Sequence, residues 1–198
     1  IESVRARGAS SVHVTANLYE NETRMRAAYE RAGLELETIY WRMQRAIPAD
    51  EVLEAPVVPE GFRIGKVDPS DDVVIEQAYH LFHDTFSEHH GIENSKKTLA
   101  DYTDHVRTAE SFDPNSWWFA WQDKTPVGLL IGDNRRVEQG VGYVRSVGVQ
   151  KHLRGRGIAR ALLLSAFADY VQQGRSSVQL GVDTGNTTGA TRLYESVG

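Results

Sequence analysis

A glycine-rich run, Arg154-Gly155-Arg156-Gly157-Ile158-Ala159, has the residue types and spacing of an anion-binding loop. It follows an alternating apolar segment at 141–149 and precedes a stretch with apolar residues at helical spacing. Backbone N–H groups at a helix start attract anions, and glycines let a phosphate approach the backbone closely. The run therefore predicts a bound phosphate or pyrophosphate. A tight strand-to-helix turn with surface arginines is the plainer alternative.

The elements around this loop predict an α/β fold with a mixed sheet. We expect strands over 62–66, 116–122, 127–133, 141–149 and 176–182. We expect helices over 71–87, 95–109 (capped by Ser95), 156–173 and 187–197. The order is β-α-α-β-β-β-α-β-α, with a hairpin around residues 123–126. An antiparallel meander followed by a βαβ-type crossover satisfies this order.

The N-terminal part carries an internal repeat. Asn21, Tyr29 and Gly33 have the same spacings as Asn186, Tyr194 and Gly198. Residues 10–17, 21–32 and 37–44 read as strand, helix and strand, and a proline-containing stretch follows them.

We therefore expect three parts. Residues 1–45 would be the C-terminal part of a first domain, residues 46–61 a linker, and residues 62–198 a second domain lacking its last strands. We expect residues beyond 198 to supply those strands, rather than the segment 34–44, because a bare sheet edge invites pairing.

Composition narrows the class of protein. The 198 residues carry a net charge of −5 and no cysteine, so disulfides and thiolate metal sites are excluded. The acidic balance argues against a nucleic-acid-binding protein, and no apolar run has the length of a membrane span. Seven histidines, including His80, His83, His89 and His90, lack a clear acidic framework, so we expect no metal site. A cytoplasmic location is the default for such a chain.

Two motifs resemble those of the GNAT superfamily of acyl-CoA N-acyltransferases. Val147-Gly148-Val149 followed by the glycine-rich run resembles the family's pyrophosphate signature, Arg/Gln-x-x-Gly-x-Gly/Ala. Asn186, the Leu193-Tyr194-Glu195 run and Gly198 resemble its second motif. The likeness covers about residues 62–198, with a partial match over 10–45. It implies the GNAT fold and acetyl-CoA as co-substrate.

The resemblance also implies roles for single residues. Backbone groups of Val147 and Val149 would pair with the pantetheine arm, and Asn186 would hydrogen-bond to it. The N–H groups of the loop would hold the pyrophosphate, at Arg154, Gly155, Arg156, Gly157, Ile158 and Ala159. Tyr194 would donate a proton to the departing CoA thiolate. Asn186 precedes Tyr194 by eight residues, where the family usually has seven.

The resemblance assigns the acceptor side to the turn between the first two helices of the domain. There Phe86, His89 and His90 would contact the acyl acceptor. The general base stays open. Its candidates are Asp133, Glu138 and His89, while the strand before the loop itself offers Tyr143 and Arg145.

The sequence therefore predicts an N-acetyltransferase in which an amine of a small molecule attacks the thioester directly. The tandem arrangement resembles that of mycothiol synthases, which acylate an amino group of a cysteinyl pseudodisaccharide. Aminoglycosides or polyamines are alternative acceptors. A non-catalytic CoA-binding or scaffolding module is the alternative of another class. The acceptor, the acyl length and the oligomeric state stay open.

Overall fold

The computed structural model describes residue 14 and residues 16–48, 50–53, 56–86, 98–183 and 190–197. The chain forms two compact units, Ile1–Ile39 and Tyr40–Gly198. In the first unit, α2 (Thr23–Arg31) has no buried residue. The predicted strand over 10–17 lies mostly outside the described residues.

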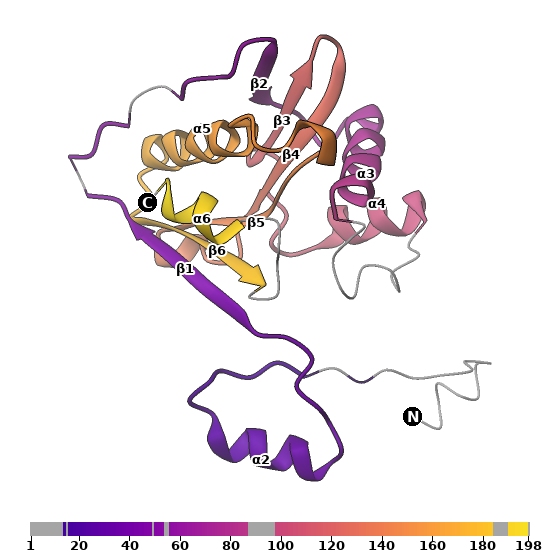
Figure 1. Ribbon diagram of the computed structural model, residues 1–198, viewed down its shortest axis with the longest axis vertical. Coiled ribbons are helices and arrows are strands. Elements are labelled where there is room, and N and C mark those ends of the chain that lie inside the picture. Colours follow the sequence, from indigo (N-terminus) through magenta and orange to yellow (C-terminus); the bar gives the residue numbers. More distant parts are fainter. Residues whose placement is uncertain are drawn as a thin grey trace. The chain divides into compact units, whose positions relative to one another are not determined.

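The second unit is a mixed α/β fold, which confirms the predicted class. Its strands form one six-stranded sheet in the order β1-β6-β5-β4-β3-β2, and only β5 and β6 pair in parallel. Figure 1 shows these elements, and their bounds are as follows: β1 (Tyr40–Ala46), β2 (Phe62–Lys66), α3 (Asp72–Phe86), α4 (Leu99–Thr108), β3 (Trp117–Gln122), β4 (Thr125–Asp133), β5 (Val141–Val149), α5 (Ile158–Gln172), β6 (Ser177–Asp183) and α6 (Ala190–Glu195). Two short 3-10 turns, η1 (Val137–Gln139) and η2 (Lys151–Leu153), flank β5.

Two apolar clusters, the α5-side cluster and the α3-side cluster, cover the two faces of the sheet. Helix α5 buries Leu162, Ala166 and Tyr170 in the cluster that holds Trp118, Leu130 and Val144 of the strands. Helix α3 buries Ile75, Ala78 and Leu81 in the other cluster, against Phe119, Leu129 and Ile131. Side chains of neighbouring strand residues point to opposite faces of the sheet, so Leu129 and Leu130 belong to different clusters. The sheet is thus covered by α5 on one face and by α3 with α4 on the other (Figure 1).

Strand β1 occupies the sheet edge beside β6, and this overturns one expectation. Tyr40 pairs with Asp183 and Ala46 with Ser177 in a continuous antiparallel register. Gln179 Nε2 donates to Gln44 Oε1 at 2.8 Å, which ties the two strands through their side chains. We expected residues beyond 198, and not the segment 34–44, to cover this edge. That expectation is wrong, because residues 40–44 of the segment lie in β1 and pair with β6. Unpaired N–H and C=O groups of β6 were available, and β1 satisfies them.

Helix α4 begins at a cap other than the predicted one. Thr98 Oγ1 accepts from Asp101 N at 3.2 Å, and the Asp101 carboxylate accepts from Thr98 N at 3.0 Å. This reciprocal capping box satisfies two backbone donors at once, which one serine hydroxyl does not do. The prediction of Ser95 as the cap is wrong, because Thr98 caps the helix. Ser95 itself lies outside the described residues.

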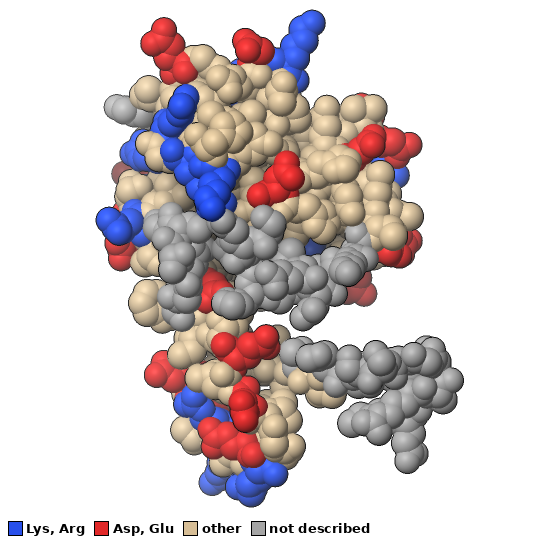
Figure 2. All heavy atoms as spheres, turned by 45° about the vertical axis from the view of Figure 1, so that its right-hand side comes forward, with Lys and Arg blue, Asp and Glu red and all other residues tan. Residues whose placement is uncertain are grey.

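Charged side chains of both signs share the described surface. Figure 2 shows Lys and Arg interspersed with Asp and Glu on the face that it displays. Ion pairs join some of them, among them Lys66–Asp169 and Arg107–Asp72. None of the described helices combines the length and the apolar character needed to cross a membrane. The predictions about nucleic acid and cytoplasmic location stay predictions.

Candidate active site

The parallel strands β5 and β6 separate halfway along their length. Their pairing begins at Val141 with Ser177 and ends at Val144 with Leu180. Both strands continue, β5 to Val149 against β4 and β6 to Asp183 against β1. The second half of β5 therefore has a strand partner on one side only. We call this opening the splay.

Backbone groups of Val147 and Val149 face the splay. Gln150 N donates to Val127 O at 3.0 Å, which makes Gln150 and Val127 a hydrogen-bonded antiparallel pair. Such pairs alternate along a ladder, so Val149 opposite Gly128 and Val147 opposite Leu130 are non-bonded pairs. Their N–H and C=O groups therefore point away from β4. A ligand lying in the splay can pair with them as an added strand would.

The glycine-rich loop joins the open end of the splay to α5. Gly155 and Gly157 adopt left-handed backbone angles, with φ of +77° and +84°. A Cβ on Gly155 would meet no atom within 4 Å, so the space before it is open. Gly157 is the N-cap of α5 and contributes no side-chain cap, which leaves the first N–H groups of a 15-residue helix for another acceptor. This arrangement fits a phosphate group.

Arg154 is held inward rather than extended toward the loop. Its Nε donates to Val149 O at 3.2 Å, and its Nη2 donates to Thr85 O at 3.0 Å in the last turn of α3. The side chain thereby connects the start of the loop to α3. Arg156, in contrast, is exposed, so of these two arginines it is the one whose side chain is available to a phosphate.

Tyr194 lies on α6, half-buried against the α5-side cluster that also contains Val149 and Leu153. Burial raises the pKa of Tyr194 to about 12. The hydroxyl is therefore protonated at neutral pH, as a proton donor must be. Asn186, the second residue of this motif, lies outside the described residues.

The two acidic candidates for the general base lie away from the splay. Asp133 ends β4 opposite Tyr143, where β5 is still paired with β6. Its carboxylate is buried and accepts from Arg135 Nε at 2.8 Å and Nη2 at 2.6 Å. Glu138 is exposed in η1, beyond the same end of the sheet. The geometry brings neither carboxylate together with Val147 or the loop.

Phe86 lies beside the splay at the end of α3. A Cβ built on Gly148 would lie 2.7 Å from Thr85 Oγ1 and 3.2 Å from Phe86 Cε2, so α3 packs directly on β5 at this point. The other predicted acceptor residues, His89 and His90, lie outside the described residues. Phe86 is therefore the one predicted acceptor contact whose position is known.

Three residues at the splay were not predicted as a group. Arg145 follows the last β5–β6 pair, and its Nη2 lies 3.3 Å from His105 Nε2 on α4. Tyr102, one helical turn before His105, has a buried hydroxyl without a hydrogen-bond partner in the described part of the chain. Burial raises the pKa of Tyr102 to about 12, and the charge of Arg145 opposes this rise. Only Arg145 was noted from the sequence, because it stands in the strand before the loop.

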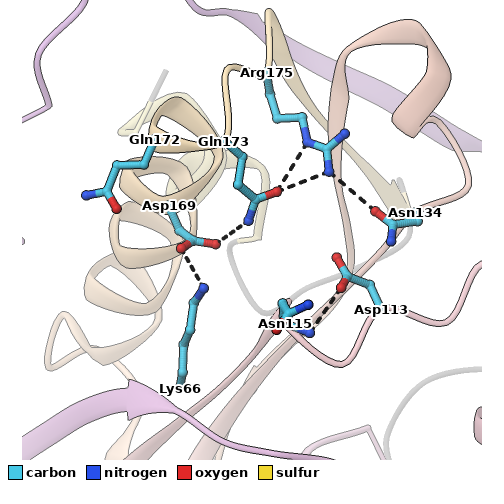
Figure 3. Close-up of a pocket in the computed structure, with 8 residues that line it drawn as sticks. All are labelled: Lys66, Asp113, Asn115, Asn134, Asp169, Gln172, Gln173 and Arg175. Carbon is cyan, nitrogen blue, oxygen red and sulfur yellow. Dashed lines mark hydrogen bonds and ion pairs between the residues drawn. The ribbon is translucent and has the colours of Figure 1, made fainter.

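A separate polar hollow of about 430 Å³ lies near the other end of α5 (Figure 3). Its polar groups largely bond to one another, as in the ion pair of Lys66 with Asp169 at 2.5 Å and the bond from Arg175 to Gln173 at 3.1 Å. Asp169 lies about 16 Å along the helix from its first residue, so the hollow is not part of the splay. Within the described residues, no three His, Asp or Glu side chains are grouped to hold a metal ion.

The sequence profile of the acetyltransferase (GNAT) family matches residues 75–198, well over half of the chain. The chain belongs to this family. The mycothiol acetyltransferase of Thermobispora bispora is 36% identical over 164 residues, covering 80% of this chain and 52% of that protein. The mycothiol acetyltransferase of Kocuria rhizophila is 32% identical over 149 residues, covering 71% and 46%.

A crystal structure of a GCN5-related N-acetyltransferase from Sphaerobacter thermophilus superposes with a TM-score of 0.70 at 29% identity. It is matched over 90% of this GNAT chain and 53% of its own. The prediction of a GNAT-type acyltransferase is therefore confirmed at the level of the family. The chain spans about half the length of these relatives. The first copy, inferred from the Asn21–Tyr29 repeat, stays a prediction.

Proposed function

We propose that this GNAT chain transfers an acetyl group from acetyl-CoA to a primary amine of a small molecule. The observation that carries the proposal is the splay, because it leads directly into the uncapped start of α5. A pantetheine arm paired with Val147 and Val149 would have its pyrophosphate at residues 154–159. Family membership and the name of the relatives, mycothiol acetyltransferase, support this donor and reaction.

The reaction is a direct displacement. The neutral amine nitrogen attacks the thioester carbonyl carbon, a C–N bond forms, and the C–S bond breaks. The thiolate takes a proton from the Tyr194 hydroxyl, and the nitrogen loses a proton to a base or to water. Asn186 is proposed to hydrogen-bond to pantetheine. Asp133 and Glu138 were predicted as the base, but both lie away from the splay, so we propose that water takes this proton.

The pKa of Tyr194 limits how much it can contribute. An ordinary thiol has a pKa of about 8.5, so donation from a tyrosine of pKa about 12 is uphill by about 5 kcal/mol. The transfer becomes easier if the thiolate is formed in the same apolar surroundings, because burial raises the pKa of the thiol as well. Tyr194 is therefore proposed as an assisting acid that water can partly replace.

The non-catalytic alternative has less support. A sensor or scaffold needs only the splay and the loop, whereas the proposed reaction also gives Tyr194 a role beside the same apolar cluster. Release of CoA thiol on addition of amines distinguishes an enzyme from a sensor. Acetyl-CoA that stabilises the protein against heat without any thiol release would favour the sensor.

Tyr194→Phe tests the proposed acid. We expect turnover to fall by about tenfold to a hundredfold, at or below the lower end for general acid catalysis. The ratio to wild type should stay constant between about pH 6 and pH 9, because the hydroxyl remains protonated throughout. Tyr29→Phe is the matched control at the equivalent repeat position and should leave turnover unchanged. Equal single-turnover rates for Tyr194→Phe and wild type would exclude the role.

A further inference from the structure

One arginine of β5 stands at a β-bulge and projects to the face of the sheet covered by α3 and α4. Ile131 pairs with Ser146 and Gly132 with Val144, so Arg145 has no partner of its own on β4. Val144 packs against α5, so alternation already points Arg145 to the other face, and the bulge leaves it without a cross-strand neighbour on β4. Here the guanidinium of Arg145 reaches α4, on the face of the sheet covered by α3 and α4.

The bulge coincides with the apex of the splay. The β5–β6 pairing ends at Val144, so Arg145 is the first residue beyond it. From Val149 back to Arg145 an extended strand runs about 13 Å, along which a pantetheine arm held at the loop would lie. Tyr194 and the loop are packed against the α5-side cluster, whereas Arg145 projects to the opposite face. An acceptor approaching the thioester from the α3–α4 face would come from the side to which Arg145 projects.

The chemistry of Arg145 differs from that of its neighbours. Arg135 and Arg107 both bind carboxylates of this chain, Asp133 and Asp72. Within the described residues, Arg145 makes no ion pair, and its guanidinium contacts the ring nitrogen of His105. A guanidinium has five N–H donors in a planar fork that matches a carboxylate. His105 Nε2 can accept a hydrogen bond from only one of these donors.

We infer that the amine acceptor carries a carboxylate close to its amino group, bound by Arg145. The inference rests on the proposed function. Arg145 is then the residue that determines specificity. His105 is a positioning residue that holds one edge of the guanidinium and leaves the rest for the substrate. Tyr102 lies one helical turn before His105. Within the described residues its buried hydroxyl has no hydrogen-bond partner, the kind of local cost that functional sites retain.

The test uses α-amino acids and the corresponding α-amino amides as a matched panel of acceptors, with acetyl-CoA as donor. Wild type should acetylate the preferred acid with a kcat/KM at least about tenfold above that of its amide, as expected for loss of a charge-assisted bond. Arg145→Gln should remove this preference, and Arg145→Lys should keep part of it. Comparing the ratio between variants cancels the different basicities of the two amines.

Two further variants separate recognition from structure. Arg63→Gln removes an arginine that stacks on Trp121 on the edge strand β2, and it should keep the full preference. His105→Ala should raise KM for the acids with little change in kcat. The affinity for acetyl-CoA, followed by thermal shift, should be the same in all variants.

The possible failures are distinguishable. If the amides are acetylated as well as the acids, or Arg145→Gln lowers both equally, the inference is overturned while acetyl transfer stands. If no carboxylate-bearing amine is acetylated, the inference is also overturned. If acetyl-CoA neither stabilises the protein nor is consumed, the proposed function itself fails.

Discussion

Gly155 illustrates, at the scale of single residues, how this loop can admit a phosphate. Its φ of +77° is a left-handed conformation that costs other residues roughly 1–2 kcal/mol. No atom would lie within 4 Å of a Cβ at this position. A side chain would therefore occupy space that the proposed pyrophosphate needs, in addition to straining the backbone.

Gly155→Ala and Gly174→Ala form a matched pair. Gly174 also has a left-handed backbone, with φ of +71°, and open space around its Cβ, but it follows the other end of α5. Both substitutions should lower the free energy of unfolding by the same amount, about 1–2 kcal/mol. Only Gly155→Ala should weaken acetyl-CoA binding, by about tenfold. Calorimetric titration measures this, and equal affinities would argue against pyrophosphate at the loop.

The sequence predicts the structural role of some single residues and not of others. The loop was predictable because its glycines and the following helix are adjacent in the chain. The contact between Arg145 and His105 was not, since it joins residues 40 apart through a bulge that depends on strand register. Asp133 was a plausible base from its sequence position, but its burial, which leaves its carboxylate bound to Arg135, depends on how the end of β4 packs.

At the scale of elements, β5 and α5 approach closely enough to exclude a methyl group. A Cβ on Gly142 would lie 2.5 Å from the ring of Tyr170, which is buried in the α5-side cluster. Tyr170 also donates from its hydroxyl to Tyr143 O at 3.3 Å. The helix therefore fixes β5 at the paired half, directly before the splay opens.

Gly142→Ala should destabilise the protein by about 1–3 kcal/mol through overpacking. Gly65→Ala is its control on β2, because the added Cβ would make an ordinary contact of 3.6 Å with Trp121 and the backbone is not left-handed. We expect Gly65→Ala to change stability by less than about 1 kcal/mol. Urea unfolding measures both. A Gly142→Ala protein as stable as wild type would mean that α5 can withdraw from β5 freely.

Local patterns predicted most elements of the sheet but not all their ends. The strands of residues 62–66 and 141–149 have the bounds expected from alternation. The β3–β4 turn is shorter than expected, since Gln122 pairs with Thr125 and Asp123 takes a left-handed φ of +53°. The start of α4 was misplaced because a serine is a plausible cap until the reciprocal bonds of Thr98 and Asp101 are known.

At the scale of the molecule, β1 makes the segment before the linker part of the second unit. The division between compact units falls between Ile39 and Tyr40. No local signal could assign β1 to β6, because the pairing joins segments from opposite ends of the unit. The sequence supports a strand near 37–44, but only the tertiary structure says which edge it covers.

A fragment of residues 40–198 should therefore be more stable and more soluble than a fragment of residues 47–198. The shorter fragment loses β1 and exposes the backbone of β6, an edge that pairs readily with other chains. Light scattering and thermal unfolding compare the two. If the fragments behave alike, β1 contributes nothing to the sheet edge.

The β1–β6 pairing also has a consequence for synthesis in the cell. Translation runs from the N-terminus, so β1 is made well before Ser177 begins its partner strand. At usual elongation rates the delay is on the order of ten seconds. During this delay the β1 segment, which includes Tyr40 and Trp41, has no partner strand. Pairing of this segment with another chain must be avoided until β6 has left the ribosome.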